Sequence, residues 1–337
     1  MIRRIAAAAL TLAVAALLLV SAWPQLFGLQ RTPLVAHIVS LRGLAACAAV
    51  ALLALLVVLA LVSRRSRRMT GSLGVLLLAF VLVNAAVLST RGFGDTPFEA
   101  KAASDITVLE WNTLGPATTP EAIAELALKY EADVVVLPET ILANATQVAL
   151  LMRAGGRPMW AHTLAYDQIS PARSTSLLTS AELGEYDYDS AAKTTAVLPT
   201  VVATPRNGSG PTIVAVHAVA PIPDQFANWP ADLELLANIC VGDNIIMAGD
   251  FNATVDHMSG LGSGPGAALG DCVDAAAASK NAALGTWPSM LPALLGAPID
   301  HVMATPDWSV TGMEVIQTLN GSGSDHRPIV VQLSRRG

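Results

Sequence analysis

Hydrophobic positions divide the chain into two parts near residue 90. Before it, apolar residues form three runs, at 5–21, 43–62 and 73–88, and only Asn84 interrupts the third. Each run is close to the ~20 residues that a helix needs to cross the hydrocarbon core of a bilayer. A helix buried in a soluble protein would show a polar stripe, and these runs show almost none. We therefore expect three transmembrane helices within residues 1–90, with the lipid bilayer as the partner of residues 5–90.

Beyond residue 104, apolar residues occur in short runs rich in Val, Ile and Leu, which are typical of buried strands. The predicted strands are 106–109, 133–137, 174–179, 194–198, 212–216, 244–248, 297–302 and 329–333, and the predicted helices are 120–130, 143–153 and 231–240. Residues 91–103 lack periodicity and predict a linker. Strands outnumber helices and partly alternate with them, which favours an α/β sandwich with a mixed core over residues 104–337.

Charge changes sign at the same boundary. Residues 1–90 hold eight arginines and no acidic residue, whereas residues 91–337 hold 12 basic and 26 acidic residues, a net charge of −14. Because basic loops stay cytoplasmic, Arg3, Arg4 and the cluster at 64–68 predict three crossings that end on the extracytoplasmic side of the cell membrane. A cleaved signal peptide is the rival interpretation, since residues 20–22 resemble a cleavage site, although Trp23-Pro24 follows them unfavourably.

The three cysteines leave a question open. Cys47 lies in the second apolar run, and Cys240 and Cys272 lie in the acidic part of the chain. An oxidising compartment would allow Cys240 and Cys272 to pair. Two separate small buried residues are the alternative, because pairing depends on a spatial separation that sequence does not contain.

Polar residues that can bind a metal ion or a phosphate group stand at the ends of the predicted strands. They are Asn112, Glu139, His217, Asp250, Asn252, Asp300, Asp325 and His326. Carboxylates and amides suit a hard cation, and such a cation assists phosphate-ester chemistry. Two neighbours have alternative interpretations: Arg327 as a phosphate clamp or an ion-pair partner, and Trp287 as a core residue or a substrate contact. His301 is expected to be a structural residue on the opposite face from Asp300.

These motifs together resemble the endonuclease/exonuclease/phosphatase superfamily, which has a DNase I-like fold. The resemblance covers about residues 104–335 and rests on the residues just given, above all on Gly249-Asp250-Phe251-Asn252 and on 324–328, which reads SDHRP. It implies a four-layered α/β sandwich that follows the all-α transmembrane region. It also implies a divalent metal ion, usually Mg²⁺, with Mn²⁺ as a possible substitute.

The resemblance further implies a role for each motif residue. Asn112 and Glu139 would bind the metal ion, with Asp325 as a further ligand. Asp250 would orient the attacking water, and Asn252 would bind the phosphate. His326, paired with Asp300, would be the general base or a transition-state stabiliser, and His217 would protonate the leaving group.

We therefore expect a membrane-anchored, metal-dependent phosphoesterase on the extracytoplasmic side, with a lipid-linked or small phosphate ester as the favoured substrate. Nucleic acid is possible but disfavoured, because an acidic unit repels a polyanion and nucleic-acid binders usually present a basic face. An extracellular DNase- or RNase-type endonuclease is one alternative. A non-catalytic membrane scaffold that retains the fold is the other.

Overall fold

The computed structural model describes residues 1–337 apart from 64–66, 95, 168, 190–193 and 337. The chain forms two compact units, Met1–Arg91 and Gly92–Gly337. Arg64, Arg65 and Ser66, which belong to the basic cluster used above to predict topology, lie outside the described residues.

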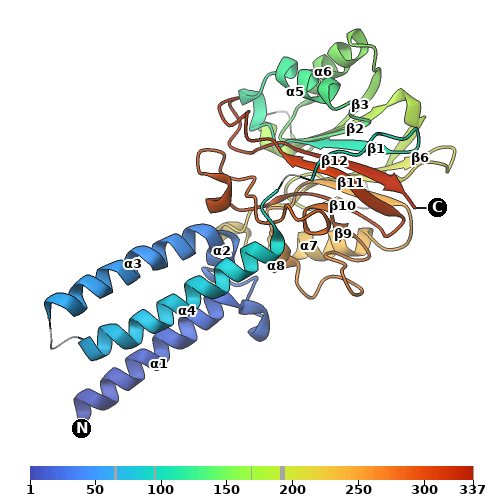
Figure 1. The fold of residues 1–337 in the computed structure, drawn as a ribbon. Helices are drawn as coiled ribbons and strands as arrows, with labels where there is room; N and C mark the ends of the chain where they lie inside the picture. The colour runs from blue at the N-terminus through green and yellow to red at the C-terminus, as the bar shows by residue number, and fades with distance from the viewer. Residues whose placement is uncertain (64–66, 95, 168, 190–193, 337) are drawn as a thin grey trace. The chain divides into compact units, whose positions relative to one another are not determined.

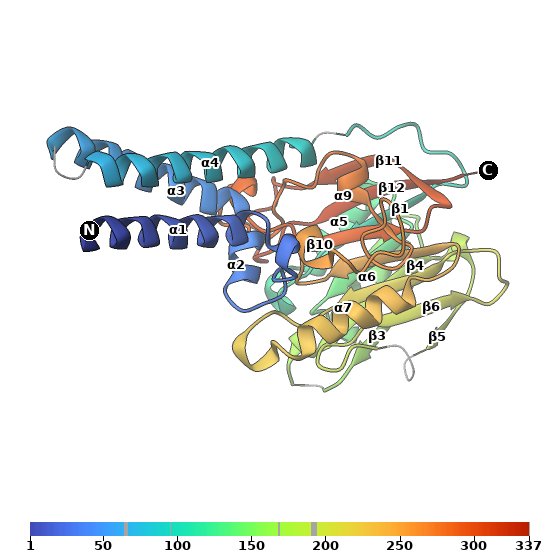
Figure 2. The same ribbon diagram turned by 90° about the horizontal axis from the view of Figure 1, so that it is seen from below.

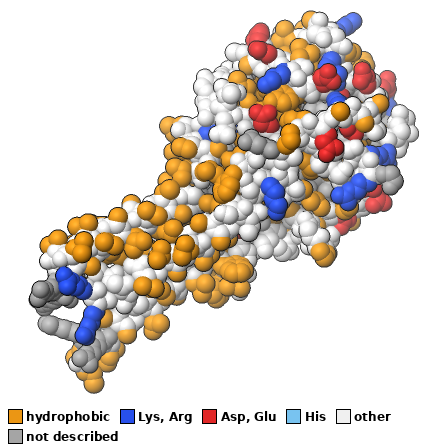
Figure 3. Space-filling model, viewed as in Figure 1, with side chains coloured by type: hydrophobic (Ala, Val, Ile, Leu, Met, Phe, Trp, Pro, Cys, Tyr) orange, Lys and Arg blue, Asp and Glu red, His pale blue; other side chains and the backbone are white. Residues whose placement is uncertain are grey.

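Among its described residues, the first unit contains three helices that are long and apolar enough to cross a membrane, as the hydrophobic runs predict. They are α1 (Ile2–Ala22), α3 (Arg42–Val62) and α4 (Arg67–Arg91), and the chain between the first two holds η1 (Pro24–Phe27) and α2 (Val35–Ser40) (Figure 1). Hydrophobic side chains cover the visible surface of these helices, whereas acidic side chains gather on the second unit (Figure 3). Such a surface is stable when lipid, rather than water, surrounds the helices.

Two buried polar side chains of the first unit, those of Arg42 and Asn84, bond to each other. The Arg42 guanidinium donates to the Ala22 carbonyl oxygen (2.9 Å) and to Asn84 Oδ1 (3.0 Å), and Asn84 Nδ2 donates to the Phe80 carbonyl oxygen (2.9 Å). Polar side chains within membrane helices are costly unless they are paired. Asn84, the residue that interrupts the third apolar run, is therefore an internal contact of the bundle.

The second unit is a four-layered α/β sandwich, which confirms the expected fold class. Its strands are β1 (Ile106–Glu110), β2 (Val134–Pro138), β3 (Met159–Ala165), β4 (Ser174–Ser180), β5 (Tyr186–Asp189), β6 (Val201–Pro205), β7 (Thr212–His217), β8 (Ile245–Asp250), β9 (Val273–Asp274), β10 (Asp300–Ala304), β11 (Trp308–Val315) and β12 (Ile329–Arg335). Its helices are α5 (Pro120–Lys129), α6 (Leu142–Ala154), α7 (Asn228–Ile239), α8 (Val255–Met258) and α9 (Ala275–Ala278), with short 3-10 turns η2 (Gly115–Ala117), η3 (Pro171–Arg173), η4 (Ala181–Leu183), η5 (Pro223–Gln225) and η6 (Ala293–Leu295).

The strands form two six-stranded mixed sheets, ordered β11-β12-β1-β2-β4-β3 and β5-β6-β7-β8-β10-β9. Helices α5 and α6 cover the outer face of the first sheet, and α7 lies along the outer face of the second (Figures 1 and 2). Alternation along each strand builds the layers. In β2, for example, Val134 and Val136 point into the core between the sheets, whereas Val135 and Leu137 pack in the cluster beneath the helices.

Local sequence explains the element boundaries that it predicts correctly. Thr119 caps α5, because its hydroxyl accepts a hydrogen bond from the Ala122 amide (3.2 Å), and Pro120 occupies the first helical position. The strand predicted at 194–198 is wrong: this segment is a loop, and β6 begins only at Val201. The hydroxyl of Thr194 accepts from the Thr200 amide, and that of Thr195 donates to the Leu198 carbonyl, so these bonds compete with sheet pairing.

Strands β3, β5, β9 and β11 were not predicted. β9 has only two residues, and β3, β5 and β11 carry polar or half-exposed residues at many positions, so none of them forms a continuous apolar run. Edge position accounts for this composition, because β3, β5, β9 and β11 are the four outermost strands of the two sheets.

Residues of the predicted linker are bound to the second unit. The Gly92 carbonyl oxygen accepts from the Ala283 amide (3.2 Å), the Gly94 amide donates to the Lys280 carbonyl (3.2 Å), and the Glu99 amide donates to the Thr311 carbonyl (2.9 Å). The polypeptide thus joins the second unit at the residue that directly follows α4.

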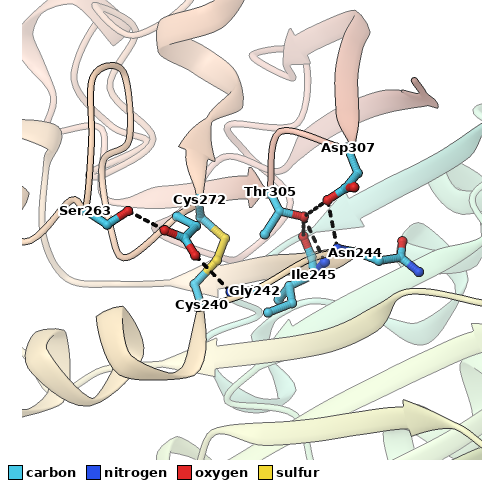
Figure 4. The surroundings of a disulfide bond; sticks show 9 residues. Cys240, Gly242, Asn244, Ile245, Ser263, Cys272, Thr305 and Asp307 are labelled. Atoms are coloured by element: carbon cyan, nitrogen blue, oxygen red, sulfur yellow. Dashed lines mark hydrogen bonds between the residues drawn. A yellow bond between two sulfur atoms is a disulfide. The ribbon is translucent and has the colours of Figure 1, made fainter. Parts of the chain in front are cut away.

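Cys240 and Cys272 form a disulfide, which settles the pairing that the sequence left open (Figure 4). The bond connects the end of α7 to the loop before β9, across 32 residues of sequence. The Asp271 carboxylate accepts from the Gly242 amide (2.8 Å) and from the Ser263 hydroxyl, and these contacts hold both sides of the bond.

Candidate active site

The strands bring the predicted site residues to one edge of the two sheets. β1 and β2 run parallel and are followed by Asn112 and Glu139, and β7 and β8 run parallel and end at His217 and Asp250, which are register partners. β10 runs antiparallel to β8, so its first residue, Asp300, pairs with Asp250. β12 runs antiparallel to β1, which places the preceding Asp325 and His326 at the same edge.

Asp250 is held by the backbone geometry of the motif that contains it. Gly249 has φ +147, and a Cβ there would overlap the carbonyl oxygen of Val216 on the neighbouring strand, so only glycine fits. Asn252 has φ +47, which turns the chain so that its amide N–H donates to Asp250 Oδ1 (2.8 Å) and its side-chain Nδ2 to Oδ2 (3.2 Å). Asn252 Nδ2 also donates to the Ala218 carbonyl oxygen (2.9 Å).

Asn112 joins the two sheets at the site. Its Nδ2 donates to Glu139 Oε1 (3.2 Å) in the first-sheet half and to Asp250 Oδ2 (3.1 Å) in the second, while its Oδ1 accepts from the Leu114 amide (3.0 Å). Glu139 is half-buried and has φ +60. Burial raises the pKa of the Glu139 carboxyl, whereas the Asn112 hydrogen bond and the nearby His326 lower it.

His326 and Asp300 form a buried pair. His326 Nδ1 bonds to Asp300 Oδ2 (2.9 Å) and Oδ1 (3.1 Å), and its Nε2 lies 3.9 Å from Asp250 Oδ2 and 4.0 Å from Asp325 Oδ1. Burial opposes the charged imidazolium, but the neighbouring carboxylates outweigh it and raise the pKa of His326 to about 10. At neutral pH His326 is therefore a cation held against Asp300.

The pKa of Asp250 is also raised, but here the shift favours the neutral form of the group. Burial and the adjacent Asp300 raise the pKa of Asp250 to about 7, against the lowering effects of His326, the Asn252 amide and Asn112. A carboxyl group that ionises near neutral pH can accept a proton efficiently at that pH.

His217 is buried and neutral. Burial, with help from the cationic His326, lowers the pKa of His217 to about 3. Its ring Nδ1 has no hydrogen-bond partner among the described residues, and its carbonyl oxygen accepts from the Thr195 hydroxyl (3.3 Å). A neutral imidazole can donate one hydrogen bond, but protonation of a leaving group would require an anionic substrate to raise its pKa.

Glu110 belongs to the site and was not predicted. It ends β1 on the face that points between the sheets, it is fully buried, and neither carboxylate oxygen has a hydrogen-bond partner among the described residues. Burial, and then the charges of Asp300 and Asp250, raise its pKa well above the usual value. Alternation could have found it, because Glu110 shares the inward face of Ile106 and Val108.

The structure also shows the contacts of four neighbouring residues, Asp325, Trp287, Arg327 and His301. Asp325 Oδ2 accepts from the Trp287 indole N–H (2.8 Å), and Trp287 is half-buried, so it contacts the site directly. Arg327 is buried, its guanidinium donates to backbone carbonyls, including that of Ser289 (2.8 Å), and it forms no ion pair with any described residue. His301 points away from the site and bonds to Asp274 Oδ2 (2.6 Å) and the Ala253 carbonyl (2.8 Å).

The donor set of the site suits a hard divalent cation. Asp250, Asp300 and His326 offer ligand atoms within 4.8 Å of one another, but His326 and Asp300 already bond to each other. Glu139 and Asp325 add further carboxylates at the same edge, and Asp325 Oδ1 is buried with no hydrogen-bond partner among the described residues. Several carboxylates that converge with few compensating cations are characteristic of sites for Mg²⁺ or a similar ion.

Comparisons with known proteins agree with this geometry. Residues 109–326, more than half of the chain, match the Endonuclease/Exonuclease/phosphatase family. A humanized D. rerio TDP2 with 14 mutations superposes with a TM-score of 0.51 at 16% identity, covering 69% of this chain and 100% of that chain. The endonuclease/exonuclease/phosphatase from Bacteroides vulgatus superposes with a TM-score of 0.50 at 15% identity, covering 69% and 99%. None of the curated proteins compared with the chain matches it.

Proposed function

This chain belongs to the Endonuclease/Exonuclease/phosphatase family, whose members are phosphoesterase hydrolases, and we propose that it is a membrane-anchored, divalent-metal-dependent phosphoesterase. The observation that carries the proposal is the buried His326–Asp300 pair beside Asp250, surrounded by Asn112 and Glu139 at one sheet edge. This combination offers a base, a fixed positive charge and oxygen ligands within one site.

Glu139 and Asp325 would hold the metal ion, with Asn112 as a third ligand. Asn112 Nδ2 faces Glu139, so a ligand role for Asn112 requires the opposite orientation of its side-chain amide. A bound Mg²⁺ or Mn²⁺ would supply Lewis-acid polarisation of a phosphoryl oxygen. Such a cation would also offset the cost of burying the Glu139 carboxylate.

The protein side chains can divide the remaining work. Asp250, with a pKa of about 7, accepts a proton from the water that attacks phosphorus, and the bond from phosphorus to the leaving oxygen breaks. His326, held as a cation by Asp300, stabilises the negative charge that grows on the phosphoryl oxygens. These states favour the stabiliser role for His326 over the general-base role.

Asn252 and His217 would complete the phosphate site. Asn252 Nδ2 donates to the Ala218 carbonyl (2.9 Å) and to Asp250 Oδ2 (3.2 Å), so it would bind a phosphate oxygen by giving up the longer bond to Asp250. His217 faces a region of positive charge from His326, which an incoming phosphate would neutralise. The phosphate would thereby raise the pKa of His217 and allow it to protonate the leaving oxygen.

The expected location of the protein at a membrane supports a lipid-linked or small phosphate ester as substrate. Three apolar helices could span the membrane, and the disulfide between Cys240 and Cys272 fits an oxidising, extracytoplasmic compartment. The net charge of −14 over residues 91–337 disfavours a long polyanion such as nucleic acid.

The test compares four substrates with the full chain in detergent and Mg²⁺: bis-p-nitrophenyl phosphate, p-nitrophenyl phosphate, phospholipid vesicles and plasmid DNA. We expect hydrolysis of a small or lipid ester, with Asp250→Ala and His326→Ala each reducing turnover by about 10²–10⁴-fold. Asp243→Ala, an exposed carboxylate before β8 and so at the opposite edge, is the matched control and should retain activity.

EDTA should remove the activity, and Mg²⁺ or Mn²⁺ should restore it. Activity that survives thorough chelation would contradict the metal requirement. Nicked plasmid with intact small esters would favour the nuclease function, and a folded protein that is silent on all four substrates would favour the scaffold.

A further inference from the structure

The loop of residues 285–297 forms part of the wall of the site. The Trp287 indole donates to Asp325 Oδ2 (2.8 Å), and the Ser289 amide donates to the Asp325 carbonyl oxygen (2.7 Å). At its other side, Thr286 Oγ1 accepts from the Asp300 amide (3.2 Å). The loop therefore contacts both halves of the His326–Asp300 region through polar groups.

Arg327 holds this loop in one conformation. Its guanidinium donates to the carbonyl oxygens of Gly285 (3.0 Å), Pro288 (3.4 Å), Ser289 (2.8 Å) and Leu291. Its amide also donates to the Thr286 carbonyl (2.8 Å). A buried guanidinium with several backbone acceptors fixes the path of the chain, so the outward side chains of the loop are displayed by a rigid support.

Those outward side chains are large and apolar. Met290 is 86% exposed and Leu294 is 42% exposed, and Pro292 between them is also exposed. No charged residue lies between Lys280 and Asp300 in the sequence. A surface loop usually carries polar residues, so an ordered, uncharged loop with exposed Met and Leu is characteristic of contact with an apolar partner.

The path of the chain favours the bilayer as that partner. The apolar helix α4 ends at Arg91, and the next residue, Gly92, already accepts a hydrogen bond from the Ala283 amide. Gly94 is bound to Lys280 in the same segment. Ala283, two residues before the 285–297 loop, is therefore hydrogen-bonded to the residue that directly follows a candidate membrane span.

We propose that the 285–297 loop inserts Met290 and Leu294 into the membrane that holds α1, α3 and α4, and that the site therefore accepts the phosphate ester of a lipid embedded in that membrane. The substrate part of this inference rests on the proposed phosphoesterase function, whereas the insertion does not. Two side chains are sufficient for reversible contact, because the anchor keeps the loop at a high effective concentration near the bilayer.

Insertion is tested in the full chain, reconstituted into phosphatidylcholine–phosphatidylglycerol vesicles. Met290→Cys is labelled with an environment-sensitive fluorophore in a Cys47→Ser background, so that the labelled position holds the single free thiol. We expect strong quenching by doxyl-labelled lipid. Ser209→Cys, in the exposed turn before β7 at the opposite edge of the sheets, is the control and should be quenched little. Equal quenching at the two positions would overturn the insertion.

The substrate part is tested by a ratio of rates, hydrolysis of vesicle phospholipid divided by hydrolysis of bis-p-nitrophenyl phosphate. The double variant Met290→Ser, Leu294→Ser should lower this ratio about tenfold, because it removes two apolar side chains from the interface. Val241→Ser, which removes a 61% exposed side chain at the opposite edge, should leave the ratio unchanged. An unchanged ratio in the double variant would contradict the lipid substrate.

The two experiments separate the two proposals. Quenching at Met290 in a protein that hydrolyses none of the esters would retain the membrane contact and overturn the phosphoesterase function. Hydrolysis of bis-p-nitrophenyl phosphate without quenching at Met290 would do the opposite.

Discussion

At the scale of single residues, burial and neighbouring charges set the protonation states of the site. One imidazolium, that of His326, lies among five carboxyl groups, those of Glu110, Glu139, Asp250, Asp300 and Asp325. Attraction to the neighbouring carboxylates keeps His326 charged against the cost of burial. Burial first, and then the neighbouring acidic groups, raise the pKa of Glu110, Glu139 and Asp250. This excess of carboxyl groups is the physical reason to expect a divalent cation at the site.

The pH dependence of turnover should follow from two of these groups. Asp250 must be ionised to accept a proton, so kcat/KM should rise with pH through about 7. His326 must be protonated to stabilise negative charge, so kcat/KM should fall through about 10. His326→Gln should lower the rate and abolish the alkaline limb. Because the His326 imidazolium lowers the pKa of Asp250, its loss should also move the acidic limb to higher pH. Rate profiles in Mg²⁺ buffer measure both, and an alkaline limb that persists in His326→Gln would contradict the assignment.

Among the elements, β8 depends most strictly on its sequence. The close contact between Gly249 and the Val216 carbonyl allows β7 and β8 to pair while His217 and Asp250 stand side by side. The turn after β8 depends on Asn252, which adopts a positive φ at lower cost than most residues. The Gly-Asp-Phe-Asn motif is therefore explained by backbone geometry as well as by chemistry.

Gly249→Ala should lower the free energy of unfolding by several kcal/mol. Backbone strain contributes on the order of 1–3 kcal/mol, and the overpacked contact with β7 adds a second cost. The substitution should also reduce turnover, because β7 must move away from β8. Gly264→Ala is the matched control, since a Cβ at Gly264 would meet open space. Thermal unfolding of the two variants measures the difference, and equal melting temperatures would show that β7 and β8 tolerate the extra atom.

At the scale of the whole molecule, one chain joins a unit whose surface suits lipid to a unit whose surface suits water. Residues 1–90 are basic and apolar, and residues 91–337 carry a net charge of −14 and a disulfide. The basic segments favour a cytoplasmic N-terminus, and three crossings would then put the second unit on the extracytoplasmic side. The disulfide supports the same side independently, because reduced thiols prevail in the cytosol.

Labelling of one exposed residue can measure on which side of the membrane the second unit lies. Ser209→Cys, in a Cys47→Ser background, should react with a membrane-impermeant maleimide in intact cells. Reaction at the same level after lysis confirms that all copies were accessible. Labelling that requires lysis would place the Gly92–Gly337 unit in the cytoplasm and would leave the disulfide without a compartment that maintains it.

The sequence by itself determined the features that repeat along the chain. Three apolar runs became the three long helices, and seven of the eight predicted strands became β1, β2, β4, β7, β8, β10 and β12. Polar residues at or just after the ends of β1, β2, β7 and β8 reached one edge, because parallel strands end on the same side of a sheet. Those at the start of β10 and before β12 reached it because these strands run antiparallel to β8 and β1. Periodicity and position within a run are local properties, so a sequence contains them directly.

Tertiary structure alone decided features that depend on neighbours distant in sequence. The edge strands β3, β5, β9 and β11 have no apolar run of their own, and the Thr194–Thr200 bonds replace a strand that composition favoured. The pairing of Cys240 with Cys272, the contact of Trp287 with Asp325 and the bonds of Arg327 to its loop all need coordinates. Charge states followed the same rule, since desolvation and nearby charges set them, and both exist only after the sheets have packed.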